Sequence, residues 1–189
     1  LIFRFFFNDN EEYMSEQLLP TYRRGYPNAK IFPPDTKYVL PFGLGVKMRC
    51  SQSFTDTSPN TEHELHTGDS KFAVDFGVPL PDPSVIPDVP IFAARDGVVV
   101  DVRDGDDDHP PNYVPVESEL PKGNRVRIVH SDGTYTLYTH LKKGSIVVAK
   151  GDTARGGSTK LGKMGNSGYS PNYHLHFEVE KVKRESNSV

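Results

Sequence analysis

Apolar and polar residues alternate over most of the chain beyond residue 37, which is typical of strands that bury one face. The segments with this pattern are KYVLPF (37–42), KFAVDFGV (71–78), VPIFAARDGVVVDVR (89–103), RVRIVHSDGTYTLYTHL (125–141), SIVVAKGD (145–152) and YHLHFEVEKV (173–182). In the fourth segment the Asp-Gly pair favours a tight turn and predicts a hairpin. Because no long helical periodicity follows residue 40, the sequence predicts an all-β fold of antiparallel sheets.

Residues 1–36 lack this regular pattern and are predicted to form an N-terminal extension, either a prosegment or a linker, before a domain at 37–189. The opening LIFRFFFNDN is interrupted by Arg4 and is followed by no small-residue cleavage site, so it predicts a strand and no signal peptide. A short helix is expected near Glu11 to Leu19, ended by Pro20. Since the chain opens on Leu1, it is expected to begin inside a longer precursor that carries any export signal.

Charge and cysteine content exclude several classes of partner and site. The formal net charge of −3 leaves no basic footprint, which argues against a nucleic-acid partner. No apolar run approaches the ~18 residues of a membrane span. Cys50 is the only cysteine, so the chain forms no internal disulfide and no multi-thiolate zinc site.

Two short motifs are weaker than they look. GGSTKLGKM (156–164) resembles a phosphate-binding loop, but Met164 stands where Ser or Thr should bind magnesium, and the segment is interpreted as a turn. The acidic run that opens the long segment 104–124 has calcium-loop spacing without the required glycine and distal glutamate. It is therefore predicted to be a solvated loop.

The last strand places two histidines on one face. In YHLHFEVE (173–180), Leu175 and Phe177 belong to the apolar face, whereas His174, His176 and Glu178 share the other. The apolar face has the core as its partner. A face that carries two imidazoles beside carboxylates requires a different explanation.

Other segments supply matching chemistry. Asp75 lies opposite the apolar stripe of its strand, and EHELHTG contributes His63 and His66. By alternation, Thr136, Tyr138 and His140 share a face of their strand. Three strands and a loop are thus expected to bring histidines and one aspartate to a single polar surface. Neutral imidazoles and a carboxylate are ligands that Zn²⁺ takes, with an open position for water at catalytic sites.

In this order the motifs HTGDSKFAVDF, YTHL and HLHFEV resemble those of the M23 zinc metallopeptidases, the lysostaphin or LytM type. The connecting pieces PIFAARDGVVVDV, GNRVRIVHSDGTYTLYTHLKKGS, KGD and GKMGNSGYS are also similar, so the resemblance covers roughly residues 38 to 182. It implies an all-β, sandwich-like domain. Residues 1–36 have no counterpart in the resemblance.

Carried over by position, the resemblance implies that His66, Asp75 and His176 are metal ligands and that His140 and His174 are catalytic. It leaves open which of the two catalytic histidines is the base. His66 and Asp75 are nine residues apart, longer than in many members, so His63 is a rival for the first ligand position. The H-T-G context favours His66.

The function that the resemblance implies is a zinc-dependent endopeptidase that hydrolyses peptides of bacterial peptidoglycan, outside the cytoplasm in an extracellular or periplasmic location. The alternative is a zinc-binding module that acts as a non-catalytic cell-wall or regulatory domain. A complete set of five site residues favours the enzyme, because degenerate members of the family lose some of them.

Overall fold

The computed structural model describes residues 2–7, 13–16, 38–52, 73–78, 87–119 and 123–181. Its strands are β1 (Ile2–Phe7), β2 (Tyr13–Glu16), β3 (Tyr38–Val39), β4 (Arg49–Gln52), β5 (Val74–Gly77), β6 (Pro90–Phe92), β7 (Gly97–Arg103), β8 (Asn124–Val129), β9 (Thr134–Leu141), β10 (Thr153–Ala154), β11 (Lys160–Lys163) and β12 (His174–Lys181). One turn of 3₁₀-helix, η2 (Glu117–Glu119), accompanies them. The prediction of an all-β fold is confirmed.

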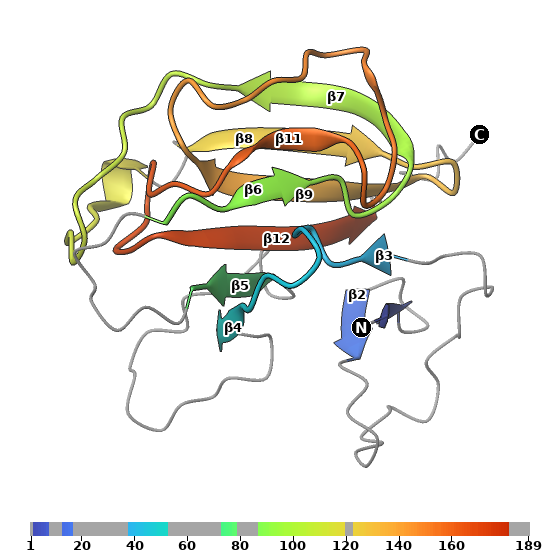
Figure 1. Ribbon diagram of the computed structural model, residues 1–189, viewed down its shortest axis with the longest axis horizontal. Coiled ribbons are helices and arrows are strands. Elements are labelled where there is room, and N and C mark those ends of the chain that lie inside the picture. The colour runs from blue at the N-terminus through green and yellow to red at the C-terminus, as the bar shows by residue number, and fades with distance from the viewer. Residues whose placement is uncertain are drawn as a thin grey trace, which may run out of the picture.

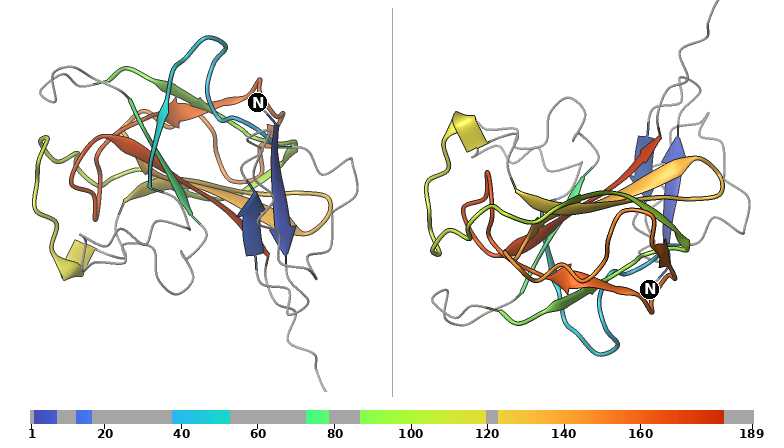
Figure 2. Two further views of the ribbon diagram at one scale, coloured as in Figure 1. Left: turned by 90° about the horizontal axis from the view of Figure 1, so that it is seen from below. Right: turned by 90° about the horizontal axis from the view of Figure 1, so that it is seen from above.

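The strands form three antiparallel sheets, and the largest carries the order β10-β7-β8-β9-β12-β5-β4. A two-stranded sheet of β11 and β6 lies over the middle of this long sheet, as Figure 1 shows. Two views along the layers, in Figure 2, show the small sheet facing the large one. A third sheet, β2-β1-β3, joins the N-terminal strands to the domain through the pairing of Ile2 with Val39.

The core lies between the long sheet and the β6–β11 sheet. Side chains of both sheets meet there with no exposure to solvent, among them Ile91 of β6, Leu161 of β11, Tyr138 of β9 and Leu175 of β12. Burial of such side chains is worth about 1.5–3 kcal/mol each. One face of β9 and β12 is therefore committed to packing, and only the opposite face is left for chemistry.

The predicted hairpin at HSDGTY is confirmed. β8 and β9 pair antiparallel from Asn124↔Leu141 to Val129↔Tyr135. Gly133 in the connecting turn has φ = 81°, a left-handed conformation that glycine adopts without steric cost. The hairpin runs along the strand direction of the long sheet, with this turn at one end and Leu141 at the other.

Two predicted elements differ in the structure. Residues Tyr13–Glu16 of the expected helix are strand β2, because they pair with β1 from Phe7↔Tyr13 to Arg4↔Glu16. SIVVAKGD forms no strand: Val147 donates to Leu161 O of β11, whereas Gly151 donates to Val99 O of β7. The segment crosses from one sheet to the other, so it cannot run along either.

Besides β2, the strands that were not predicted are the two-residue β10 and the longer β4 and β11. β4 has a polar sequence, RCSQ, and pairs at the edge of the long sheet with β5. β11 occupies the second half of the segment predicted to be a turn. Gly162 lies in this strand, where a Cβ would come within 3.2 Å of Ser145 Oγ. Tertiary pairing determines both strands, and their local patterns do not reveal it.

Candidate metal centre

Asp75 and the two histidines of β12 are brought together by the register of β5 and β12. His176 pairs with Asp75 and His174 pairs with Gly77, so the three polar side chains project from the same face of the sheet. His176 Nδ1 lies 2.9 Å from Asp75 Oδ1, and His174 Nε2 lies 3.7 Å from Asp75 Oδ2. The predicted sharing of one face by Asp75, His174 and His176 is confirmed.

His140 reaches the same face by a different route. Thr139 pairs with Arg125 and Leu141 pairs with Asn124, so His140 is an extra residue, a β-bulge, between them. Its φ is 62°, in the left-handed region that side chains other than glycine rarely adopt. Because of this strained bulge, His140 lies on the same face of the sheet as His174 and His176, which strict alternation from Tyr138 would not allow.

The expectation that Thr136, Tyr138 and His140 share a polar face is therefore wrong for the first two. Thr136 and Tyr138 are fully buried, and Tyr138 Oη accepts a hydrogen bond from Ala94 N at 2.7 Å. Burial raises the pKa of the Tyr138 hydroxyl far above its usual value. Tyr138 packs in the core, on the opposite side of β9 from the histidine cluster.

The cluster consists of His140, His174 and His176, which offer ring nitrogens within 4.8 Å of one another. The ring centroid of His140 lies 4.7 Å from that of His174 and 5.7 Å from that of His176. His66 and His63, the two candidates for the remaining ligand, lie outside the described residues. Four of the five predicted site residues are thus found side by side.

Two of the rings are held by backbone carbonyls at Nδ1. His140 Nδ1 donates to Ser167 O and His174 Nδ1 donates to Asn172 O, both at 2.8 Å. Because a carbonyl oxygen only accepts, each Nδ1 carries the proton and each neutral ring keeps a lone pair on Nε2. Burial, followed by the neighbouring His174 and His176, lowers the pKa of His140 well below its usual value, so this ring is neutral at pH 7.

His176 is held in the opposite way. Its Nε2 donates to Glu178 Oε1 at 2.6 Å, which directs Nδ1 toward Asp75. Burial opposes the charged form, but hydrogen bonds with Asp75 and Glu178 outweigh burial and raise the pKa of His176 to about 10. The protonated His176 ring thus lies between two carboxylates, and its Nδ1 proton occupies the position that a metal cation would take.

This donor set fits zinc. Metal-binding histidines usually donate their second ring N–H to a carboxylate, as His176 does to Glu178. A carboxylate oxygen of Asp75 faces His176 Nδ1, which offers a lone pair once its proton leaves, and two ligand atoms of one tetrahedral zinc lie about 3.3 Å apart. The 2.9 Å between these two atoms is about 0.4 Å shorter than that spacing.

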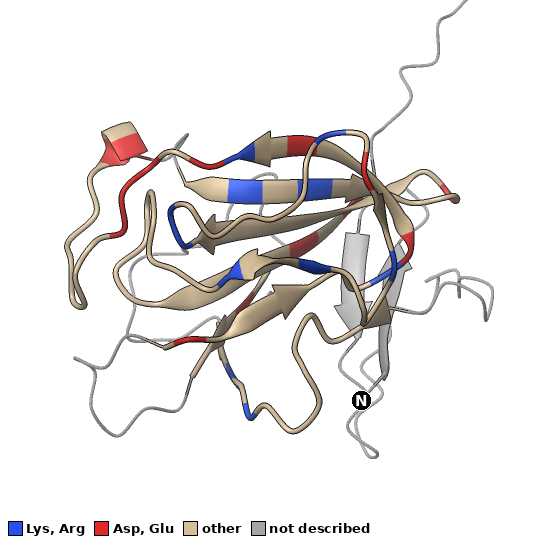
Figure 3. Cartoon of the chain, turned by 45° about the horizontal axis from the view of Figure 1, so that its top comes forward, with Lys and Arg blue, Asp and Glu red and all other residues tan. Residues whose placement is uncertain are grey.

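The acidic segment after β7 is a loop with Asp104 and Asp107 exposed, as predicted, but its carboxylates also support the site, which was not predicted. Asp104 accepts from Gly144 N at 2.7 Å, Asp106 from Gly123 N at 2.8 Å and Asp108 from Asn166 N at 2.7 Å. Its carboxylates tie the ends of β8 and β9 to the loop before β12. Figure 3 shows this red segment running along one end of the molecule, beside that loop.

Sequence reasoning missed the residues that support the site. Asn124, Asn166, Ser167 and Ser170 are polar and yet have no exposed surface. For the last three, the only signal is the cluster of small polar residues in GNSGYS, just before β12. Glu178 was placed on the correct face, but its bond to His176 was not foreseen.

Comparison with known proteins identifies the family. Residues 77–188, more than half of the chain, match the profile of peptidase family M23. The chain belongs to peptidase family M23. Asp75 and the HTG histidine precede the matched range, whereas His140, His174 and His176 lie inside it. The resemblance found in the motifs is thereby confirmed.

Two curated relatives extend the likeness. An uncharacterized metalloprotease of Buchnera aphidicola is 30% identical over 164 residues, 86% of this chain and 35% of that protein. The peptidoglycan DD-endopeptidase ShyA of Vibrio cholerae is 34% identical over 115 residues, 61% of this chain and 21% of that protein. The chain therefore spans about a third of the first relative and about a fifth of the second.

Solved structures share the fold at low sequence identity. The complex of SpoIIIAH and SpoIIQ contains a chain with a TM-score of 0.54 and 21% identity, covering 76% of this chain and 92% of that one. The catalytic domain of the prophage-encoded M23 protein EnpA from Enterococcus faecalis gives 0.50 and 22%, covering 77% and 88%. These matches support the M23 fold. In the described ranges, no helix is long and apolar enough to cross a membrane.

Proposed function

We propose that this M23 family member is a zinc-dependent endopeptidase that hydrolyses peptide bonds of bacterial peptidoglycan, in an extracellular or periplasmic location. The observation that carries the proposal is the pairing of Asp75 with His176 beside two further imidazoles, those of His140 and His174. The sequence likeness to a peptidoglycan endopeptidase supports the choice of substrate.

Asp75 and His176 would hold the metal, with His66 as the third ligand. Glu178 fixes the orientation of His176 through its bond to Nε2 and strengthens the ring as a donor. Bound zinc supplies Lewis-acid polarisation and a water that ionises near neutral pH. The proton on His176 Nδ1 would leave when the metal enters, so metal affinity should weaken in acid.

His140 and His174 would handle protons at the reacting peptide. Each ring is anchored at Nδ1, so each presents Nε2 as the nitrogen that accepts or donates a proton. Two such groups suffice for hydrolysis, since a neutral Nε2 takes the proton of the attacking water, and an imidazolium, protonated on both nitrogens, donates from Nε2 to the developing oxyanion or the leaving amine. The low pKa of His140 keeps it in the accepting form.

Digestion of purified peptidoglycan tests the proposal. The full chain is incubated with the substrate as purified, after chelation, and after chelation followed by restored zinc, and released peptides are identified by mass. We expect new peptide ends in the first and third reactions only. Full activity at zero zinc would overturn the metallopeptidase assignment, whereas bound zinc without cleavage would favour the non-catalytic binding module.

A further inference from the structure

The loop between β11 and β12 contains three polar residues that are fully buried, namely Asn166, Ser167 and Ser170. Buried polar groups cost free energy unless they are hydrogen-bonded, so the bonds of such residues are specific. Ser167 Oγ donates to Leu141 O at 2.8 Å and accepts from Asn124 N at 3.0 Å. The hydrogen bonds of Asn166 and Ser170 instead connect to His174 of the histidine cluster.

The amide of Asn166 has only one acceptable orientation. Its Nδ2 donates to His109 O at 3.1 Å and to Pro110 O at 3.2 Å. Both partners are carbonyls and only accept, so Oδ1 must point the other way, toward Ser170 Oγ at 2.6 Å. Segment 108–110 also bonds to the backbone of Asn166, because Asn166 N donates to Asp108 and His109 N donates to Asn166 O.

The orientation of Asn166 decides what Ser170 can do. A hydroxyl has one proton, and Ser170 Oγ has two neighbours that only accept, Asn166 Oδ1 at 2.6 Å and Asn172 O at 2.9 Å, so its proton goes to one of them. Toward His174 Nδ1, 3.2 Å away, Ser170 Oγ can then only accept. Asn172 O, at 2.8 Å from the same nitrogen, also only accepts. Two acceptors at Nδ1 leave the neutral His174 ring one tautomer, with the lone pair on Nε2.

We propose that Asn166 and Ser170 are positioning residues that hold His174 in the tautomer and orientation its reaction requires. The inference rests on the proposed function and extends it from His174 to the hydrogen-bonded residues behind it, Ser170 and Asn166. Segment 108–110 is the outer end of that chain, so the long acidic loop acts on the site through Asn166. His140 has no side-chain counterpart among the described residues, because its Nδ1 bonds to the backbone of Ser167.

A double-mutant cycle on the full chain tests the assignment. Ser170→Ala should lower kcat about 10-fold, as typical of outer-shell partners, with KM and zinc content unchanged. In a His174→Ala background, the same change should lower kcat no further, because the ring through which Ser170 acts is gone. Equal fold-losses in both backgrounds, or loss of zinc from Ser170→Ala, would overturn the proposal.

Ser145→Ala serves as the control, because Ser145 Oγ accepts a hydrogen bond from Lys163 N at 3.0 Å and bonds to no histidine among the described residues. It should keep the wild-type kcat while losing comparable stability. Nitrogen-15 NMR of His174 in the zinc-loaded wild type gives a readout that needs no activity. A proton on Nδ1 is expected, and a proton on Nε2 with Nδ1 bare would overturn the inference even if the protein cleaves nothing.

Discussion

His130 is buried, the cluster of His140, His174 and His176 is buried or half-buried, and both touch the β8–β9 hairpin, yet their ring nitrogens end on different partners. His130 donates from Nδ1 to Asp96 O at 2.8 Å and meets the Thr136 hydroxyl at Nε2, 3.1 Å away. Both of its nitrogens are satisfied inside the protein. Tyr38 packs edge-on against the ring, with the centroids 5.5 Å apart.

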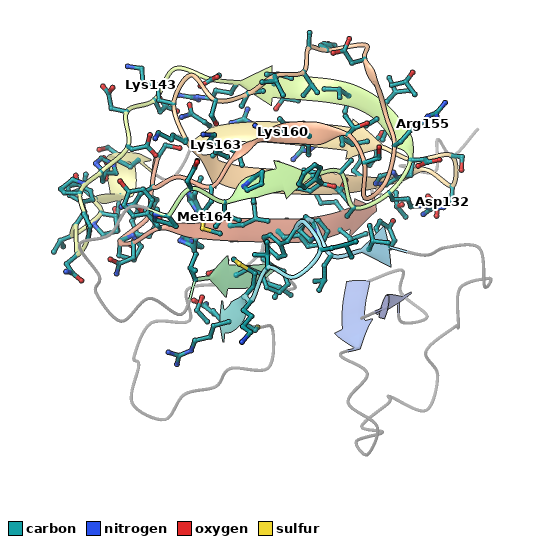
Figure 4. The ribbon with its side chains drawn as sticks, viewed as in Figure 1. Asp132, Lys143, Arg155, Lys160, Lys163 and Met164 are labelled. Atoms are coloured by element: carbon teal, nitrogen blue, oxygen red, sulfur yellow. The ribbon has the colours of Figure 1, made fainter. Side chains whose placement is uncertain are left out.

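The cluster differs because each ring keeps one nitrogen for the site. His140 and His174 use Nδ1 for carbonyls, and His176 uses Nε2 for Glu178. The remaining nitrogens of His174 and His176 face Asp75, and the three rings offer nitrogens within 4.8 Å of one another. Figure 4 shows how far apart the two regions are, with Asp132 of the His130 turn at one end of the long sheet and Met164, which bridges to Leu141, toward the other. Low exposure is common to both regions, and what distinguishes the proposed site from a structural histidine is that each ring of the cluster keeps one nitrogen for it.

The largest effect is expected from Asp75→Ala. Removing the carboxylate that faces His176 Nδ1 leaves too few ligands, so zinc per chain and peptide cleavage should fall together. Asp101→Ala is the control, since Asp101 on β7 pairs with Arg125 at 2.7 Å. It should keep both zinc and activity. Zinc retained at the wild-type level in Asp75→Ala would show that the metal lies elsewhere.

His140→Ala should separate chemistry from metal binding. The ring lies beside the proposed ligands without being one of them, so zinc should stay while kcat falls by roughly 10²–10⁴, the range for a general acid–base group. Metal analysis of the same sample that is used for kinetics provides the measurement. A variant that loses zinc in proportion to activity would make His140 a ligand instead.

His130→Ala should reverse that result, with stability lost and function kept. Deleting a buried ring with two hydrogen bonds should lower the free energy of unfolding by roughly 2–4 kcal/mol. Urea titration gives the loss, and zinc content and kcat at low temperature should match the wild type. The comparison between the two regions breaks down if this variant folds normally but binds no metal.

A smaller effect concerns pH. Burial lowers the pKa of His130, against the opposing bond to Asp96 O, so the folded state resists protonation more than the unfolded state does. Stability from this group is complete above the unfolded pKa of about 6.5 and is lost as the pH falls toward the folded pKa. One proton limits the slope to about 1.4 kcal/mol per pH unit. In the zinc-loaded protein, His130→Gln should show a shallower decline from pH 7 to pH 5, and an unchanged slope would contradict this origin.

Much of the site could be predicted from the sequence because strand alternation is a local rule. It placed Asp75 correctly, and it separated His174 and His176 from Leu175 on β12. It grouped His140 with Thr136 and Tyr138 on the polar surface, but those two lie in the core. Only a β-bulge brings His140 to the site, and nothing in YTHL marks that bulge.

The rest depended on contacts between segments distant in the chain. Asp104 and Asp108 look like solvated charges, but their oxygens accept N–H groups of Gly144 and Asn166, which lie far along the sequence. β4 is polar and becomes a strand only because β5 offers it an edge. Propensity and pattern predict elements with a buried face well, and they do not report which loop will receive a hydrogen bond.

The neighbours His174 and His176 provide the most direct test, because they lie on one face of one strand and differ only in the proposed role. Zinc per chain is measured in His174→Ala and His176→Ala purified side by side. His174→Ala should hold about one zinc, as a three-ligand site implies, whereas His176→Ala should hold little. The reverse pattern, with His176→Ala full and His174→Ala empty, would contradict the division between metal binding and proton transfer.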